Sequence, residues 1–267
     1  MSPSLVVFTL LVVLGGAVGS FVNVCVYRIP RGISLISPRS FCPYCRRPLR
    51  WYELVPIMSF LIQKGRCRTC GSAVSLQYPL VEIIFATAFV VCYVVHGPST
   101  EFAMCFGFIT LMVPVAIVDW RHFIIPNTVV VTGVLIGFVF RNVLMYDDLL
   151  QDFVATGSGV GTMLLIRLSG NFVFRKETMG MGDVKLGGLV SLFLGFEGFV
   201  AAVWIAAMIG GMYALSCFWS SRFPANTLPG GAVPIPFGSF LAVASCFVLL
   251  FGDLVLNLAQ TWLISIQ

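Results

Sequence analysis

The sequence predicts an all-α polytopic membrane protein, and three observations support that prediction. Hydrophobic residues make up 58% of the 267 residues, and the mean hydropathy is +0.98. Only 10% of the residues are charged, whereas a soluble domain has about 25%. The third observation is a series of apolar segments, most of them close to the ~20 residues that a membrane-spanning helix needs. These eight segments cover residues 1–27, 78–96, 102–118, 124–140, 149–169, 184–196, 198–220 and 236–260.

The first apolar segment, residues 1–27, contains no charge, and the first basic residue after it is Arg28. A cleaved signal peptide carries basic residues before its apolar core. Because the order is reversed here, we expect a retained first span. Of the later segments, 184–196 is the shortest. The only long polar insertion is residues 28–77, between the first and second spans.

The distribution of Lys and Arg predicts the orientation of the spans, because basic residues collect on the cytoplasmic side. If the loops after the odd-numbered segments are cytoplasmic, fifteen of the sixteen basic residues lie at that side and only Arg141 lies outside. The opposite orientation would violate the rule in almost every loop. We therefore expect both termini outside the cytoplasm and the 28–77 insertion inside it.

The insertion contains two Cys-x-x-Cys pairs, Cys42 with Cys45 and Cys67 with Cys70, with 21 residues between them. Four thiolates at this spacing are typical of a tetrahedral zinc site. Two disulfides are the alternative, which a reducing cytosol disfavours. Since four thiolates leave no open coordination position, we expect the zinc ion to be structural and to fold a loop too short for a core of its own.

The same insertion carries nine basic residues and a single acid, Glu53. Such an excess could bind nucleic acid. However, both ends of the insertion are attached to membrane spans, so anionic lipid headgroups explain the charge more simply. We expect a lipid bilayer as a partner and no nucleic acid.

Three acids share one depth in the predicted topology. Glu82, Asp119 and Asp183 lie at the cytosolic ends of the second, third and sixth segments. An ionisable residue inside a membrane span is costly and therefore indicates function. Pro114, five residues before Asp119, can kink that helix, and Pro126 suits the first turn of the next one.

The surroundings of Asp183 also favour a functional site. Asp183 follows Gly180 and Gly182, which allow unusual backbone angles and the close approach of another peptide. A helix N-cap is the simpler interpretation of Asp183, but it leaves the glycines and the matching Asp119 unexplained. Lys185 lies two positions further along, on another side of the helix, and we expect it to contact a lipid headgroup or substrate.

The residue types favour aspartic peptidase chemistry at Asp119 and Asp183. The chain has two histidines and no His-Glu-x-x-His pattern, so a zinc-protease site has no ligands. Ser158 lies among glycines, and neither histidine has an evident reason to reach it, so we interpret that segment as helix packing. Two close carboxyls share one proton, so that one activates water while the other polarises a carbonyl.

At this point the chain resembles the bifunctional type IV prepilin peptidases, also called leader peptidase/N-methyltransferases. "GMGDVK" at 180–185 is similar to their Gly-x-Gly-Asp box, and "DWRHFIIPN" at 119–127 to their other aspartate box. The further matching segments run in the family's order over nearly the whole chain. They are "GSFVNVCVYRIP" at 19–30, the cysteine pairs, "WYELVP" at 51–56, "QYPLVE" at 77–82 and "PFGSFLA" at 236–242.

The resemblance implies a membrane enzyme with two activities. It implies cleavage of the short basic leader of type IV prepilins or type II secretion pseudopilins at the cytosolic face of the bacterial inner membrane. It also implies methylation of the new N-terminal amine from S-adenosylmethionine. Residues 1–27 are then the first span, 28–77 a zinc-binding, methyltransferase-associated domain, and 78–267 the peptidase domain. The candidate residues for the methyl donor or the substrate amine are Glu53, Glu82, Asn23 and Arg28.

The chain departs from the family pattern at three positions. Gln77 replaces a common arginine, Leu54 a usual asparagine and Ser239 a frequent proline. Gln77 and Leu54 fall in the part associated with methylation, so a peptidase without methylation is an alternative. A zinc-folded transporter that relays protons through Glu82, Asp119 and Asp183 is another, although no charges lie deeper in the spans to continue such a path.

Overall fold

The computed structural model describes residues 3–144, 148–219 and 235–266, and the side chains of residues 5–143, 148–219 and 235–252. In this part of the chain the regular structure is helical, and the only β structure is two isolated bridges in the loop that carries the cysteine pairs. The all-α class expected from the sequence is confirmed. The chain divides into two compact units, Met1–Thr110 and Leu111–Gln267.

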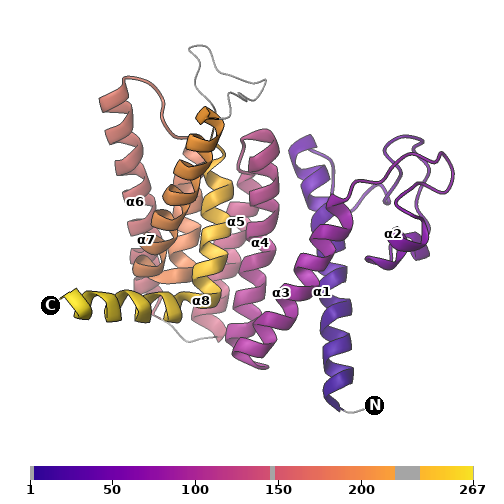
Figure 1. Cartoon of the computed structure of the whole chain (residues 1–267), viewed down its shortest axis with the longest axis horizontal. Helices are drawn as coiled ribbons and strands as arrows, with labels where there is room; N and C mark the ends of the chain where they lie inside the picture. The colour runs from indigo at the N-terminus through magenta and orange to yellow at the C-terminus, as the bar shows by residue number, and fades with distance from the viewer. Residues whose placement is uncertain (1–2, 145–147, 220–234, 267) are drawn as a thin grey trace. The chain divides into compact units, whose positions relative to one another are not determined.

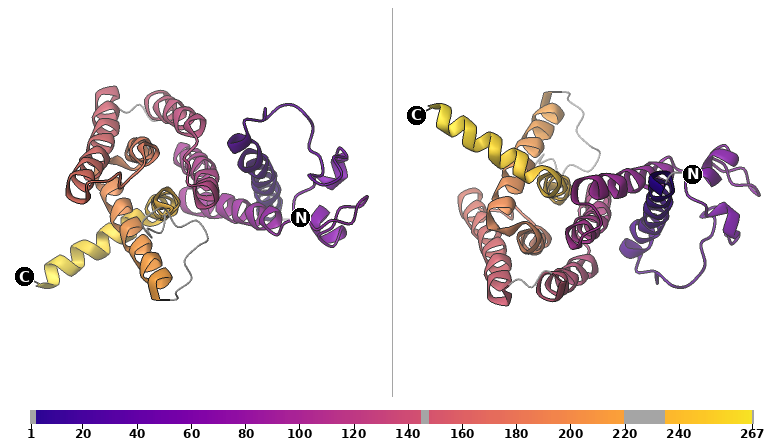
Figure 2. Two further views of the ribbon diagram at one scale, coloured as in Figure 1. Left: turned by 90° about the horizontal axis from the view of Figure 1, so that it is seen from above. Right: turned by 90° about the horizontal axis from the view of Figure 1, so that it is seen from below.

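The first unit is built on two adjacent apolar helices, α1 (Pro3–Arg28) and α3 (Gln77–His96), which lie side by side in Figures 1 and 2. Two glycines of α1 allow this close packing. A Cβ on Gly15 would lie 2.8 Å from Cα of Ala86, and a Cβ on Gly19 would lie 2.8 Å from Cα of Glu82. Small residues at this spacing let membrane helices approach backbone to backbone.

The loop between α1 and α3 contains three short helical turns. They are η1 (Ile29–Arg31), η2 (Trp51–Glu53) and α2 (Met58–Ile62). The helix α4 (Thr100–His122) follows α3 after a short connection and contains Pro114. Cys92 of α3 and Cys105 of α4 are buried with their Sγ atoms 3.2 Å apart, so the early part of α4 packs on α3.

The second unit contains the later helices, which are drawn from rose to yellow in Figure 1. They are α5 (Asn127–Val139) with the π-helix η3 (Phe140–Leu144), α6 (Leu149–Phe174), α7 (Met181–Trp219) and α8 (Phe237–Ile266). α6 and α7 lie side by side. Their backbones approach closely at Gly159, where a Cβ would lie 2.6 Å from the carbonyl oxygen of Gly187. Of the glycines around Ser158, Gly159 serves helix packing, as the sequence predicts, whereas a Cβ on Gly157 or Gly161 would meet no atom within 4 Å.

The predicted count of eight spans is not confirmed. Five helices are long and apolar enough to cross a membrane, and two shorter apolar helices cover Asn127–Val143 and Phe237–Gly252. The predicted segments 184–196 and 198–220 belong to one element, α7, which is broken at Gly195 (φ 69°, ψ 174°). α8 is broken at Phe251. The predicted boundary at 220, and Arg222 beyond it, lie outside the described residues.

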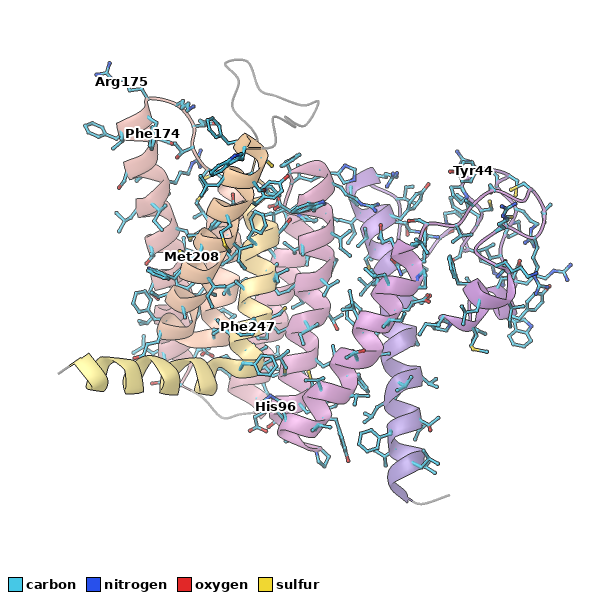
Figure 3. All side chains as sticks on the ribbon, in the orientation of Figure 1. Tyr44, His96, Phe174, Arg175, Met208 and Phe247 are labelled. Atoms are coloured by element: carbon cyan, nitrogen blue, oxygen red, sulfur yellow. The ribbon has the colours of Figure 1, made fainter. Side chains whose placement is uncertain are left out.

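The outer surface of the second unit carries large apolar side chains. Figure 3 shows Phe174 at the end of α6, Met208 on α7 and Phe247 on α8, and all three are exposed. Exposed side chains of this size on long apolar helices are expected where lipid replaces water around the protein. The fold therefore agrees with the membrane location that the composition predicts.

Candidate functional site

Asp119 lies in the last turn of α4, where it is buried and hydrogen-bonded to the start of α8. Its Oδ2 atom accepts a hydrogen bond of 2.7 Å from the backbone N–H of Ser239 and one of 3.0 Å from the Ser239 hydroxyl. The same hydroxyl lies 2.8 Å from the carbonyl oxygen of Ala116. A hydroxyl carries one hydrogen, so it can donate to an ionised Asp119. When Asp119 is protonated, the hydroxyl can accept from it and donate to Ala116.

Asp183 lies in the first turn of α7 and is partly exposed. Its carboxyl accepts hydrogen bonds from the backbone of Gly180 and of Asp183 itself, so it satisfies amide groups that the helix start leaves open. The carboxyls of Asp183 and Asp119 are close enough to repel each other electrostatically. The structure therefore brings together the two aspartates that the sequence selects, which lie 64 residues apart in the chain.

Ile125, in the connection between α4 and α5, packs between the two glycines beside the aspartates. A Cβ on Gly182 would lie 3.0 Å from Cβ of Ile125. A Cβ on Gly238 would lie 2.8 Å from Cδ1 of Ile125 and 3.0 Å from Oδ2 of Asp119. The close approach expected at Gly182 is thus made by a side chain of the protein itself.

Neither of the two glycines before Asp183 adopts the positive φ that glycine allows. The described glycines with positive φ do not include Gly180 or Gly182. The nearest atom to a Cβ on Gly180 is Oδ2 of Asp183, at 3.5 Å. Gly180 therefore leaves room around the Asp183 carboxyl, and its backbone angles are ordinary.

Lys185 is exposed on α7, and its Nζ donates a hydrogen bond of 3.1 Å to Oδ1 of Asn127, the first residue of α5. The lysine and Asp183 thus have different partners, as their spacing of two residues predicts. The contact connects the starts of α5 and α7 and leaves Lys185 at the surface beside the aspartates.

Sequence reasoning did not assign a role to Ser239, Gly238 or Ile125. Ser239 had been noticed only as a departure from the family pattern, although a Gly-Ser pair at the start of a predicted span is a signal for a close polar contact. Ile125 carries no chemical signal. Its role depends on which glycines face it, and only the packing of the helix ends shows that.

The four cysteines of the loop converge as the spacing predicts. The Sγ atoms of Cys42, Cys45, Cys67 and Cys70 all lie within 4.8 Å of one another, and those of Cys42 and Cys70 are 3.9 Å apart. Thiolates bound tetrahedrally at about 2.3 Å from zinc are ~3.8 Å apart, so the donor set fits this ion. Backbone hydrogen bonds from Cys70 and Thr69 lower the pKa of Cys67 to about 6, which favours the thiolate that a metal needs.

Each cysteine pair sits in a turn of the same design. An antiparallel bridge closes each turn, from Phe41 to Pro48 in the first and from Arg66 to Ala73 in the second. The residue after each second cysteine, Arg46 or Gly71, has a left-handed backbone with φ of 60° or 69°. The turns therefore form from local hydrogen bonds, and the metal would join them.

Two of the candidates for methyl transfer, Glu53 and Arg28, hold the loop together. Glu53 is buried and accepts hydrogen bonds of 2.7 Å from Arg47 Nη2 and 2.9 Å from the Arg50 backbone. The Arg47 guanidinium holds the pKa of the Glu53 carboxyl below its usual range. Arg28 is buried and donates to the carbonyl oxygens of Ser34, Leu35 and Pro38.

The other two candidates, Asn23 and Glu82, lie inside the first unit. Asn23 donates to the carbonyl oxygen of Tyr78 at 3.1 Å and accepts from Gln77 at 3.3 Å. Glu82 accepts a hydrogen bond of 2.7 Å from the backbone N–H of Ile57. All four candidates are buried and bonded within the protein. Their part in methyl transfer stays a prediction.

An all-helical protein with membrane-length apolar helices and paired carboxyls at helix ends has the features of a membrane-embedded aspartic peptidase. The family comparisons agree. The model of the bacterial peptidase A24 N-terminal domain matches residues 13–96, and that of the type IV leader peptidase family matches residues 105–215. The chain belongs to the type IV leader peptidase family, which confirms the resemblance found from the motifs.

Curated relatives carry the name prepilin leader peptidase/N-methyltransferase. The relative from Bacillus subtilis is 30% identical over 93% of this chain and 96% of its own length. The relative from Myxococcus xanthus is 34% identical over 77% of this chain, but the match spans only 61% of that longer protein. The relative from Klebsiella pneumoniae is 30% identical over 68% of this chain and 83% of its own length. No solved structure shows significant similarity to the chain.

Proposed function

We propose that this protein is a bifunctional membrane enzyme that cleaves the leader of type IV prepilins or pseudopilins and then methylates the new N-terminal amine. Its family membership and the shared name of its relatives support this function. The observation that carries the peptidase activity is a pair of carboxyls in one unit, with Asp119 at the end of α4 and Asp183 at the start of α7.

The pair would work as a general acid and a general base. The ionised carboxyl takes a proton from a water molecule, whose oxygen attacks the scissile carbonyl. The protonated carboxyl donates a hydrogen bond to the carbonyl oxygen and polarises it. Breakdown of the tetrahedral intermediate breaks the C–N bond, and the leaving amine takes up the proton that the first carboxyl removed from water. Ser239 can stay bonded to Asp119 in both protonation states, which keeps that carboxyl in place through the cycle.

The location follows from the positions of the aspartates in their helices. Asp119 lies near the end of one apolar helix and Asp183 at the start of another. We place the cut at the cytosolic face of the bacterial inner membrane, with both termini of the enzyme outside the cytoplasm. The apolar helix of the substrate would remain in the bilayer, and Gly180, Gly182 and Lys185 would support the site.

For methyl transfer, S-adenosylmethionine would supply the methyl group at the first unit. Glu53, Arg28, Asn23 and Glu82 each hold part of the loop or its contact with the spans. We infer that they support this activity by shaping the loop. Zinc bound by Cys42, Cys45, Cys67 and Cys70 would keep the loop folded.

A coupled assay tests the proposal. Purified protein is incubated with a prepilin and with labelled S-adenosylmethionine, and cleavage and label transfer are measured separately. We expect Asp119→Asn and Asp183→Asn each to lose at least about a thousandfold in cleavage, because either change removes one member of the acid–base pair. Both variants should still methylate a peptide that begins at the cleaved terminus.

Asp148→Asn is the matched control. Asp148 is exposed and caps α6 by accepting from the Leu150 backbone, a bond that asparagine also makes. Cleavage retained in either Asp119→Asn or Asp183→Asn would refute the assignment of the two aspartates as the acid–base pair. Cleavage by the unmodified protein without label transfer would show that the protein is a peptidase without methyltransferase activity.

A further inference from the structure

The part of the cysteine loop from residue 54 to residue 62, LVPIMSFLI, is unlike the rest of that loop. It contains no charged residue, and its single polar side chain is that of Ser59. Five of its large apolar side chains are exposed. They are Leu54 (42%), Val55 (40%), Met58 (54%), Leu61 (62%) and Ile62 (63%). We call residues 54–62 the apolar insert.

Two contacts fix the position of the apolar insert along the helices of its own unit. A Cβ on Gly16 of α1 would lie 3.3 Å from Cβ of Pro56, so the proline packs against that glycine. The backbone N–H of Ile57 donates to Oε2 of the buried Glu82 on α3. The Ser20 hydroxyl of α1 is also hydrogen-bonded to Glu82. The insert is therefore held against both helices, at a buried carboxyl group.

These contacts lie well inside the two apolar helices. Gly16 is twelve residues before the end of α1, which corresponds to about 18 Å at 1.5 Å per residue, and Glu82 is about 8 Å along α3 from its first residue. The hydrocarbon core of a bilayer is about 30 Å thick. Figure 1 shows α2 beside α1 and below the end of that helix. A bilayer crossed by α1 and α3 therefore also surrounds the insert.

The backbone of the insert suits this environment. α2 forms inside it, and the amides of Ser59 and Leu61 bond to the carbonyl oxygens of Val55 and Ile57. The Ile57 amide is satisfied by Glu82. Irregular backbone is tolerated at membrane depth only where such groups find partners in the protein.

We propose that the apolar insert is a re-entrant segment that enters the bilayer from the cysteine loop and binds lipid acyl chains through Leu54, Val55, Met58, Leu61 and Ile62. The helices α1 and α3 also expose apolar side chains close in sequence to these contacts, namely Val13 (59%), three residues before Gly16, and Leu80 (59%), two residues before Glu82. The loop is then fixed to the membrane by its middle as well as by its two ends. This proposal depends on the membrane location of α1 and α3 and does not depend on either enzymatic activity.

Photo-crosslinking to lipid tests the proposal. A benzophenone amino acid replaces Leu61 in the full chain, which is reconstituted in nanodiscs of phosphatidylethanolamine and phosphatidylglycerol, irradiated and analysed by intact mass spectrometry. Leu10 of α1 (55% exposed) is the lipid-facing reference, and Ile36 (94% exposed), in the polar part of the loop, is the matched loop control. We expect lipid adducts at position 61 within about twofold of position 10 and at least about fivefold above position 36.

Adduct formation at position 61 no higher than at position 36 would overturn the proposal. Met58, exposed to a similar degree, is replaced in a separate protein, so that the result does not depend on one variant folding. The experiment is repeated with a prepilin present. Lipid adducts that persist support the proposal, whereas their replacement by crosslinks to the prepilin would assign the insert to the substrate helix and refute the lipid assignment.

Discussion

The cysteine site and the aspartate site are built in opposite ways. The four cysteines come from 29 consecutive residues, and short-range hydrogen bonds form the two turns that present them. The aspartates come from α4 and α7, and Ser239 and Gly238 of α8 complete their surroundings. A local site can be recognised from spacing, whereas a site made of helix ends depends on how the helices pack.

The difference predicts that loss of a metal ligand disrupts one whole region. We expect Cys67→Ser to make the loop about a thousandfold more sensitive to limited proteolysis, because zinc binding supplies much of the folding free energy of such a domain. Bound zinc, measured by metal analysis, should fall well below one equivalent. Cys217→Ser, on α7, is the control and should keep both properties. A loop that stays resistant to protease in Cys67→Ser without bound metal would contradict the structural role of zinc.

The aspartate site should instead be sensitive to small changes in packing. In Gly238→Ala the new methyl group would stand 3.0 Å from Oδ2 of Asp119 and 2.8 Å from Ile125, so the carboxyl must move. A misplacement of about 1 Å costs ~100-fold in rate, and for the smaller shift needed here we expect the kcat of prepilin cleavage to fall by more than about tenfold but less than ~100-fold. Gly211→Ala on α7 is the control, because a Cβ there meets no atom within 4 Å. Equal activity of the two variants would show that this packing does not position Asp119.

The Ser239 hydroxyl should contribute less, and its effect should fall on kcat. We expect Ser239→Ala to lower kcat about tenfold with KM nearly unchanged, since the backbone N–H still holds Asp119. Ser239→Thr keeps the hydroxyl and should restore kcat to within about threefold. Ser245→Ala is the control on the same helix, because that buried hydroxyl donates to the carbonyl oxygen of Ala242, within α8 itself. A change in KM alone, or no rescue by threonine, would exclude a positioning role.

The smallest effect should come from an ion pair in the loop. Glu53→Gln keeps the acceptor for the Arg50 backbone but loses the charge that pairs with Arg47, and we expect a cost of about 1 kcal/mol to the stability of the loop at neutral pH. Protease resistance in a urea titration measures it. Glu177→Gln breaks an exposed pair with Arg167 and should change almost nothing. Equal effects of the two substitutions would show that burial of Glu53 adds no stability.

The sequence by itself determined the all-α membrane class, the four cysteines that could hold a metal ion and the two aspartates worth pairing. Composition and local spacing carry this information. Long apolar segments indicate membrane-spanning helices, and Cys-x-x-Cys turns form from neighbouring residues. The number of spans could not be fixed in this way, because a single residue, Gly195, decides whether one long apolar stretch is continuous. The hydrogen bonds of Glu53 and Arg28 were likewise beyond the sequence. Arg28 bonds to backbone carbonyl oxygens, and Glu53 bonds to one backbone amide and to one of several nearby arginines.

Only the tertiary structure decided what surrounds the aspartates and where the apolar insert lies. Ser239 reaches Asp119 across 120 residues, and Ile125 meets Gly182 and Gly238 because three helix ends pack together. From the sequence, the insert is predicted to be part of a cytosolic loop. In the structure, Pro56 packs against Gly16 and the Ile57 amide bonds to Glu82. The physical reason is the same in both cases: close packing and hydrogen bonding depend on distance in space, and the sequence records only distance along the chain.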